Sequence, residues 1–83
     1  MTREEFQILY TECLAEAVRA DPTLYYYPPE EAPRVVSWIC AVMATKGARS
    51  VNITGSGGFK RMAKRLGIKH TVRDIAALWE ACT

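Results

Sequence analysis

The sequence predicts an all-α protein, a compact bundle of about four helices in a single small domain over residues 1–83. Two observations predict this class: apolar residues recur with the period of a helix in four segments, and capping or helix-ending residues bound those segments. A composition of 49% apolar and 24% charged residues is typical of a globular domain. No apolar run reaches the roughly 18 residues of a membrane span, so we expect no membrane partner.

The first helix is expected to begin after Thr2 and to end before Pro22. Thr2 and Glu5 have the spacing of a capping box, which stabilises a helix by about 1 kcal/mol. The proline disfavours helical geometry at Asp21, the residue before it. The predicted apolar face comprises Phe6, Leu9, Tyr10, Cys13, Leu14, Ala17 and Val18.

Three adjacent tyrosines follow, Tyr25, Tyr26 and Tyr27, ahead of two prolines. They cannot all face one core, so we expect at least one ring at the surface. Two interpretations stay open. The rings are either a contact patch, since tyrosine offers a large contact area at a low entropic cost, or a cover for a thin core with their hydroxyls in water.

A second helix is expected to begin between Pro29 and Glu31 and to end at Lys46 and Gly47, a cation followed by a glycine that can adopt left-handed geometry. Few polar residues interrupt it, so we expect it to be the central and most buried helix. Its predicted apolar stripe comprises Ala32, Val35, Val36, Ile39, Val42 and Met43, widened by Trp38 and Cys40.

Residues 47–58 are expected to form a glycine-rich loop, in which residues 50–54 alternate and could be a short extended piece. Gly55, Gly57 and Gly58 precede a basic helix, where free amide groups attract anions. The run fits neither a P-loop nor a dinucleotide fingerprint. A flexible hinge or turn is the favoured interpretation, and contact with a nucleic-acid phosphate stays open.

The last part of the chain, residues 59–83, is expected to form a basic helical hairpin. Gly67 ends the third helix, and Thr71 with Asp74 predicts the cap of a fourth. The apolar stripe of the third helix comprises Phe59, Met62, Ala63 and Leu66. That of the fourth comprises Val72, Ile75, Ala76, Trp79 and Cys82.

Charge is divided unevenly along the chain. Residues 1–45 hold three basic and seven acidic side chains, whereas residues 46–83 hold eight basic and two acidic ones. A basic cluster of this kind can neutralise phosphates or an acidic protein surface. The predicted binding residues are Lys60, Arg61, Lys64 and Arg65 on the third helix, and Lys69, His70, Thr71 and Arg73 around the turn that follows. The three tyrosines are secondary contact candidates.

Residues 59–79 also resemble a helix-turn-helix, with a small residue at Ala63, a glycine at Gly67 and an aliphatic residue at Ile68. In the usual pattern the Thr-Val pair that opens the recognition helix comes one residue later than it does here, at 71–72. The second helix is poor in side chains that read bases. The carboxyl-terminal half is therefore expected to be a degenerate version of that motif.

Catalytic and cofactor chemistry are poorly supported by the sequence. The one histidine, His70, falls in a predicted turn without a partner for acid–base work, so we expect no enzyme. Cys13, Cys40 and Cys82 are too widely spaced for a zinc site and odd in number for a disulfide scaffold. We expect no metal, no cofactor, and three small buried thiols in a reducing cytosol, with Cys82 the one to watch for intermolecular oxidation.

The stretch from Phe59-Lys60 through residues 64–71 to Ile75 resembles a recurring motif of small phage and prophage proteins. Their amino-terminal half has a start like residues 2–6 and a Tyr-Pro loop before an apolar helix. Their last helix tends to end in an aromatic-Leu pair, where this chain has Leu78-Trp79. The resemblance implies a phage-encoded accessory protein in the cytoplasm of the bacterial host, often a non-enzymatic inhibitor of host machinery, including anti-CRISPR-type inhibitors.

Two functions from different classes follow as expectations. The first, slightly favoured because the last helix lacks base-reading side chains, is inhibition of a host protein or nucleoprotein complex through the basic helical face. The alternative is direct binding of DNA or RNA by residues 59–79. A homodimer also stays open, because a thin core with Trp38, Trp79 and the tyrosines could leave apolar surface exposed.

Overall fold

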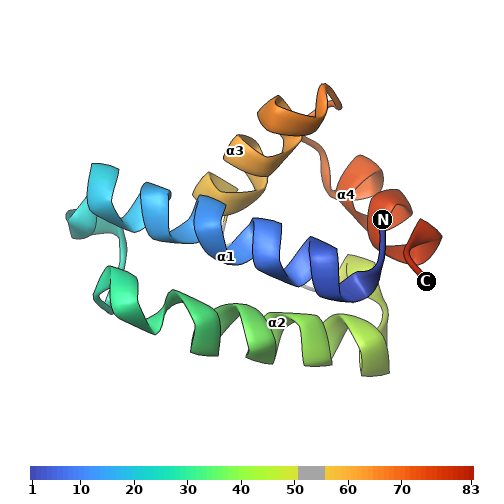
Figure 1. The fold of residues 1–83 in the computed structure, drawn as a ribbon, viewed down its shortest axis with the longest axis horizontal. Coiled ribbons are helices and arrows are strands. Elements are labelled where there is room, and N and C mark those ends of the chain that lie inside the picture. The colour runs from blue at the N-terminus through green and yellow to red at the C-terminus, as the bar shows by residue number, and fades with distance from the viewer. Residues whose placement is uncertain (51–55) are drawn as a thin grey trace.

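The computed structural model describes residues 1–50 and 56–83. These residues form four α-helices, α1 (Arg3–Ala20), α2 (Ala32–Lys46), α3 (Ser56–Leu66) and α4 (Val72–Ala81), and three short 3-10 helices, η1 (Pro22–Leu24), η2 (Pro29–Glu31) and η3 (Ala48–Ser50). The predicted all-α class is confirmed (Figure 1). The extended piece suggested at 50–54 falls outside the described residues except for Ser50, which ends η3. No helix in the described part of the chain is long and apolar enough to cross a bilayer.

Local capping signals set the helix ends where the sequence predicts them. The Thr2 Oγ1 atom accepts a hydrogen bond from the Glu5 amide at 3.0 Å, and the Glu5 carboxylate accepts one from the Thr2 amide at 2.9 Å. This bonding with Thr2 lowers the pKa of the Glu5 carboxyl. The Thr71 hydroxyl caps α4 in the same way, and Gly47 and Gly67 follow α2 and α3 with positive φ angles of 91° and 69°.

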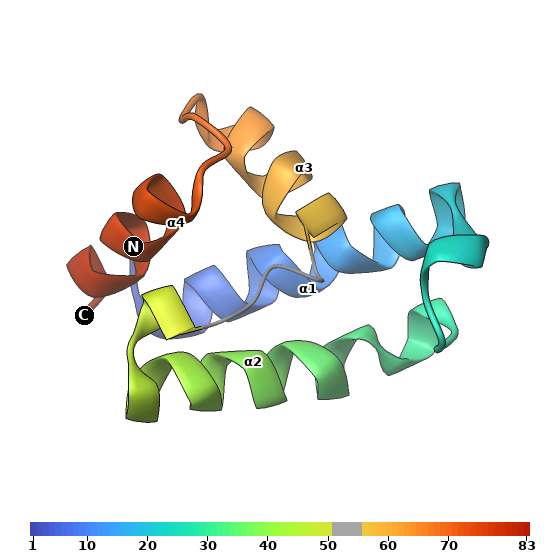
Figure 2. The ribbon, with the colours of Figure 1, turned by 180° about the vertical axis from the view of Figure 1, so that it is seen from behind.

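The central element is α1, not α2. It lies between α2 on one side and α3 with α4 on the other (Figures 1 and 2). Its buried residues are Phe6, Tyr10, Cys13, Leu14, Ala15, Ala17 and Val18. The buried residues of α2 are Ala32, Val36, Ile39, Cys40 and Met43. The expectation that α2 is the most buried helix was wrong. The apolar residues of α2 spread over more than one face of the helix, and α1 covers only one of these faces.

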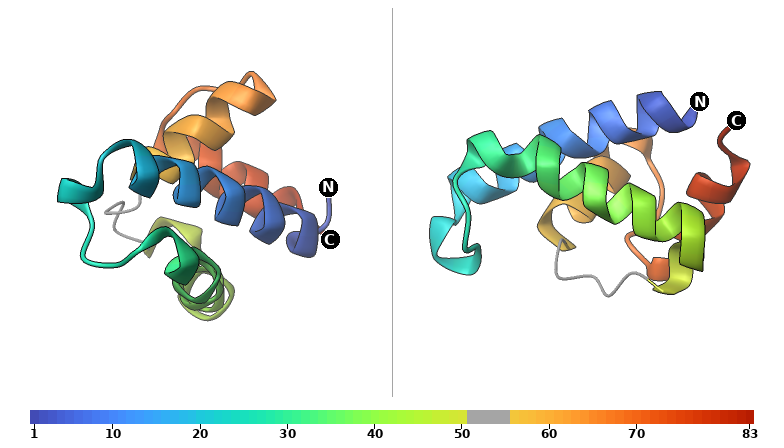
Figure 3. Two further views of the ribbon diagram at one scale, coloured as in Figure 1. Left: turned by 60° about the vertical axis from the view of Figure 1, so that its left-hand side comes forward. Right: turned by 90° about the horizontal axis from the view of Figure 1, so that it is seen from below.

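Aromatic contacts hold α1 against α3 and α4. The Tyr10 ring stacks on Phe59 with 4.5 Å between ring centroids, and Phe6 meets Trp79 edge-on at 5.2 Å. The guanidinium of Arg3 lies 4.4 Å from the centroid of the Trp79 ring. The Arg3 amide donates to the Thr83 carbonyl at 3.1 Å, so the two ends of the chain meet (Figure 3).

Gly57 and Gly58 lie in the first turn of α3, where they allow this helix to approach α1 closely. A Cβ atom on Gly58 would lie 2.8 Å from Cε1 of Tyr10 and 3.2 Å from Cα of Leu14. A Cβ atom on Gly57 would collide with the Tyr25 hydroxyl. Residues 56–58 of the predicted loop 47–58 thus belong to α3, which begins one residue before the start expected near Gly57, and these two glycines serve packing rather than the expected hinge. The third glycine of the run, Gly55, is outside the described residues.

Candidate partner-binding surfaces

The four basic residues predicted on α3 differ in exposure and in ion pairing. Lys60 and Lys64 are exposed, whereas Arg61 is half-buried. Arg65 reaches back to α1, where its Nη1 atom lies 3.3 Å from a carboxylate oxygen of Glu12 and its Nη2 atom pairs with Glu16. These ion pairs join the basic half of the chain to the acidic half and neutralise part of the predicted basic face.

The other predicted contacts lie at and beyond the turn between α3 and α4. Lys69, His70 and Thr71 are exposed. The Thr71 hydroxyl donates to the Asp74 carboxylate at 2.5 Å and accepts from its amide at 3.1 Å, so Thr71 serves as a helix cap. Arg73 belongs to the first turn of α4, which diverges from α3 after the turn (Figures 1 and 2). The eight predicted residues thus come from α3, from the turn and from the first turn of α4.

The second helix of the predicted helix-turn-helix faces the core with its apolar stripe. Ile75, Ala76 and Trp79 are buried. The exposed side chains of α4 include Arg73, Ala77, Glu80 and Ala81. Two alanines and two opposite charges offer little hydrogen bonding to base edges, so this face is poorly equipped for direct readout of DNA.

A hollow of about 340 Å³ lies where the end of α2 and η3 meet α4. We call it the basic hollow. Its lining residues are Lys46, Gly47, Ala48, Arg49, Arg73, Ala76, Ala77 and Glu80. Of this set, the sequence predicts only Arg73 as a binding residue, because Lys46 is expected to end a helix and Arg49 falls in the predicted loop. The fold brings all three cations to one place.

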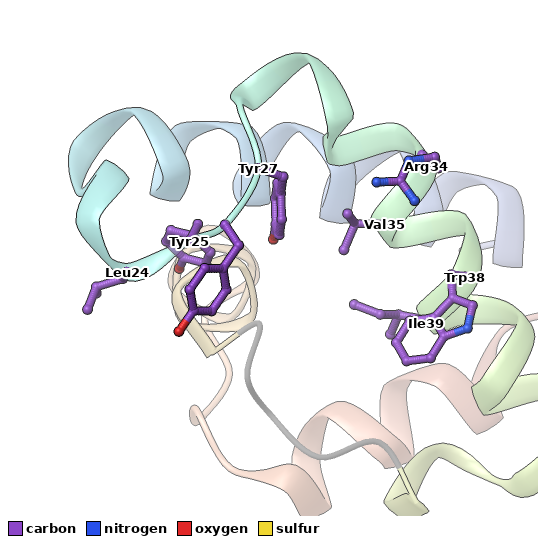
Figure 4. A pocket seen from close by; sticks show the side chains of 8 residues that line it. Leu24, Tyr25, Tyr27, Arg34, Val35, Trp38 and Ile39 are labelled. Atoms are coloured by element: carbon purple, nitrogen blue, oxygen red, sulfur yellow. The ribbon is translucent and has the colours of Figure 1, made fainter.

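A second hollow, of about 510 Å³, lies between the segment that holds Tyr25, Tyr26 and Tyr27, which we call the tyrosine loop, and the first half of α2 (Figure 4). We call it the aromatic groove. Its lining residues are Leu24, Tyr25, Tyr26, Tyr27, Arg34, Val35, Trp38 and Ile39. Tyr26 is fully exposed, and Leu24 and Trp38 are each 68% exposed. The prediction that at least one tyrosine ring lies at the surface is confirmed.

The other two tyrosines pack against the core, as the second interpretation expected. Tyr25 and Tyr27 are half-buried, with 5.8 Å between their ring centroids. The buried hydroxyl of Tyr10 has no hydrogen-bond partner among the described residues. Burial raises the pKa of Tyr10, and Tyr27 raises it further. The tyrosine loop thus covers the core with two rings and presents the third to solvent.

Trp38 is the groove residue that sequence reasoning missed as a contact candidate. The sequence predicts Trp38 as part of a widened core stripe. However, Val35, Trp38 and Val42 recur at i, i+3 and i+7 and form a second stripe beside the buried one of α2. A second apolar stripe on one helix is a signal readable from the sequence alone. At the rim of the groove, the Nε atom of Arg34 donates to the Glu31 carboxylate at 2.5 Å.

Burial disfavours the reactive thiolate form of the three cysteines. Cys13, Cys40 and Cys82 are buried and free, and burial raises the pKa of each thiol, that of Cys40 to about 11. The Cys82 sulfur donates to the Leu78 carbonyl at 3.1 Å, so its expected readiness to oxidise is opposed by burial and hydrogen bonding. In residues 1–50 and 56–83, no group of three or more His, Cys, Asp or Glu side chains could hold a metal ion.

In comparisons with known proteins, no family model matches the chain, and neither a curated protein nor a solved structure matches it.

Proposed function

We propose that this chain is a non-enzymatic accessory protein that docks a partner protein in the aromatic groove and thereby inhibits a host complex. One observation carries the proposal: Trp38, Tyr26 and Leu24 surround a single hollow and are all exposed. Scattered exposed apolar side chains are ordinary, but a cluster of them around a concavity is typical of an interaction site. Tryptophan, tyrosine and arginine are also the residues that dominate binding energy at protein interfaces.

The charge around the groove favours a protein over a nucleic acid. The lining of the groove holds one charged residue, Arg34. That base is paired with Glu31, so the groove offers a polyanion no net positive charge. We therefore commit to one occupant: a protein segment that inserts apolar side chains beside Trp38.

The phage setting and the inhibitory outcome are supported by the resemblance of residues 59–75 to small phage and prophage proteins. The contact that we propose differs from the basic helical face expected from the sequence, because Arg65 of that face is engaged by Glu12 and Glu16. Lys60 and Lys64 stay candidates for a second, weaker contact.

Photo-crosslinking identifies the partner and tests the surface together. A crosslinking amino acid replaces Tyr26 or Trp38, and a control variant carries it at Ile8, which is 54% exposed on α1. We expect a shared host protein at positions 26 and 38 and none at position 8. Crosslinks only to a second copy of this chain would contradict the proposal, since they would identify a homodimer instead.

Affinity for the identified partner then measures the groove. We expect Trp38→Ala to weaken binding of the purified partner at least about tenfold, as for a central interface tryptophan. The matched variant Ile8→Ala should bind within about twofold of the unchanged chain. Binding of the Trp38 variant at full strength, with its circular dichroism unchanged, would overturn the assignment. The functional readout is activity of the host complex with each variant added.

A further inference from the structure

We infer that the basic hollow is a binding site for a phosphate group. Three cations from three separate elements line it: Lys46 is the last residue of α2, Arg49 lies in η3, and Arg73 lies in the first turn of α4. They converge because α4 packs against η3. Neither the sequence pattern nor the proposed protein contact requires this convergence.

The chemistry of the lining fits a phosphate ester. The planar fork of an arginine can donate two parallel hydrogen bonds to phosphate oxygens, and a lysine adds a point charge. The rest of the lining is mainly small, with Gly47, Ala48, Ala76 and Ala77, so a tetrahedral anion can approach Arg49 and Arg73 closely. A volume of about 340 Å³ lies at the lower end of the range for small-ligand pockets and admits a phosphate with its sugar.

The acidic residue Glu80 allows a test of whether the hollow binds an anion. Among the described residues that line the hollow it is the one acid, and it reduces a formal charge of +3 to +2. Because a nearby carboxylate repels a bound anion, removing the Glu80 charge should tighten binding, whereas removing an arginine charge should weaken it.

The site is independent of the proposed protein contact. The basic hollow lies at the carboxyl-terminal end of α2, whereas the aromatic groove lies along its amino-terminal half. The two ends are well separated along the helix axis (Figure 2). Loss of phosphate binding would therefore leave docking at Trp38 intact, and the failure of one assignment can be distinguished from the failure of the other.

Chemical-shift mapping of backbone amides provides the test, with inorganic phosphate, adenosine 5′-monophosphate and a short DNA duplex as separate probes at about 50 mM salt. We expect saturable shifts at Gly47, Ala48 and Ala77. A response to the two small probes assigns a nucleotide-type ligand. Tighter binding of the duplex, with a log–log salt slope of about −2 to −3 for two or three neutralised phosphates, assigns a polynucleotide backbone.

Charge variants decide whether the hollow is responsible. We expect Arg49→Gln and Arg73→Gln each to weaken binding at least about fivefold, and Glu80→Gln to tighten it at least about twofold. The matched control is Lys60→Gln, which removes an exposed charge from α3 and should leave the affinity unchanged. Failure of all three probes to shift these amides would overturn the inference, and so would equal losses in the Lys60 and Arg73 variants.

Discussion

The two tryptophans show how differently the two ends of this small core are closed. Both lie on apolar helical stripes, Trp38 on α2 and Trp79 on α4. Trp79 is 3% exposed, between the Phe6 ring and the Arg3 guanidinium, whereas Trp38 is 68% exposed over the aromatic groove. The stripe of α4 meets α1 and the chain ends. On the outer stripe of α2, Val35 and Val42 are half-buried, and Trp38 alone is largely exposed.

The difference in exposure between Trp38 and Trp79 shows what helical periodicity can and cannot predict. A stripe identifies a face that is able to pack, but its burial depends on how many elements are available to cover it. In an 83-residue chain there are few such elements. Trp38, on the second stripe of α2, is therefore left largely uncovered.

The largest expected difference in stability is between variants that truncate the two tryptophans. We expect Trp79→Ala to lower the free energy of unfolding by about 3–5 kcal/mol, since it leaves a cavity beside Phe6. We expect Trp38→Ala to change it by about 0.5 kcal/mol or less, since its side chain contributes little to the core. Chemical denaturation followed by circular dichroism measures both. Similar losses in the two variants would place Trp38 in the core.

A substitution at the α1–α3 contact should give the next largest effect. We expect Gly58→Ala to destabilise the fold by about 1–3 kcal/mol, because the added methyl group would overlap the Tyr10 ring. Helix propensity alone predicts the opposite sign, a gain of about 1 kcal/mol. The control Ala41→Gly, at an exposed position of α2, should lose about 1 kcal/mol by propensity alone. A stabilised Gly58 variant would contradict the close packing described here.

The pH dependence of the unfolding free energy tests the burial of Cys40 on the inner face of α2. Burial raises the pKa of Cys40 from 9.0 to about 11. A group with a raised folded-state pKa contributes stability below its unfolded pKa and loses it as pH rises. We therefore expect the unfolding free energy to fall between about pH 9 and pH 11, and to fall less in Cys40→Ala.

A thiol placed on the exposed stripe is the matched comparison for Cys40. In Trp38→Cys with Cys40→Ala, the new thiol should react with an aromatic disulfide reagent near pH 8 much faster than native Cys40 does, because it is exposed and its thiolate is not disfavoured by burial. Equal reaction rates would show that the two stripes of α2 do not differ in burial.

The features that the sequence predicts correctly are local ones. The capping box of Thr2 and Glu5, the cap at Thr71 and the helix-ending glycines at 47 and 67 depend on neighbours within a few residues. Their hydrogen bonds form whatever the tertiary arrangement, so the four helices and most of their ends follow from the sequence.

The features that the sequence did not predict are contacts between distant segments. Arg65 looked like part of an open basic face, but the fold places it against Glu12 and Glu16, 49 and more residues earlier in the chain. Arg49 and Arg73 meet only because α4 packs against η3. Both outcomes depend on helix packing, which the spacing of charges along one segment cannot encode.

The most direct test of the account is acrylamide quenching of Trp38 fluorescence in a Trp79→Phe variant, measured before and after saturation with the crosslinked partner. We expect Trp38 in the free protein to be quenched nearly as readily as a fully exposed indole, and we expect the bound partner to shield it strongly. The control is saturation with phosphate, which should leave the quenching unchanged. A Trp38 already shielded in the free protein, or one still accessible in the saturated complex, would contradict docking at the aromatic groove.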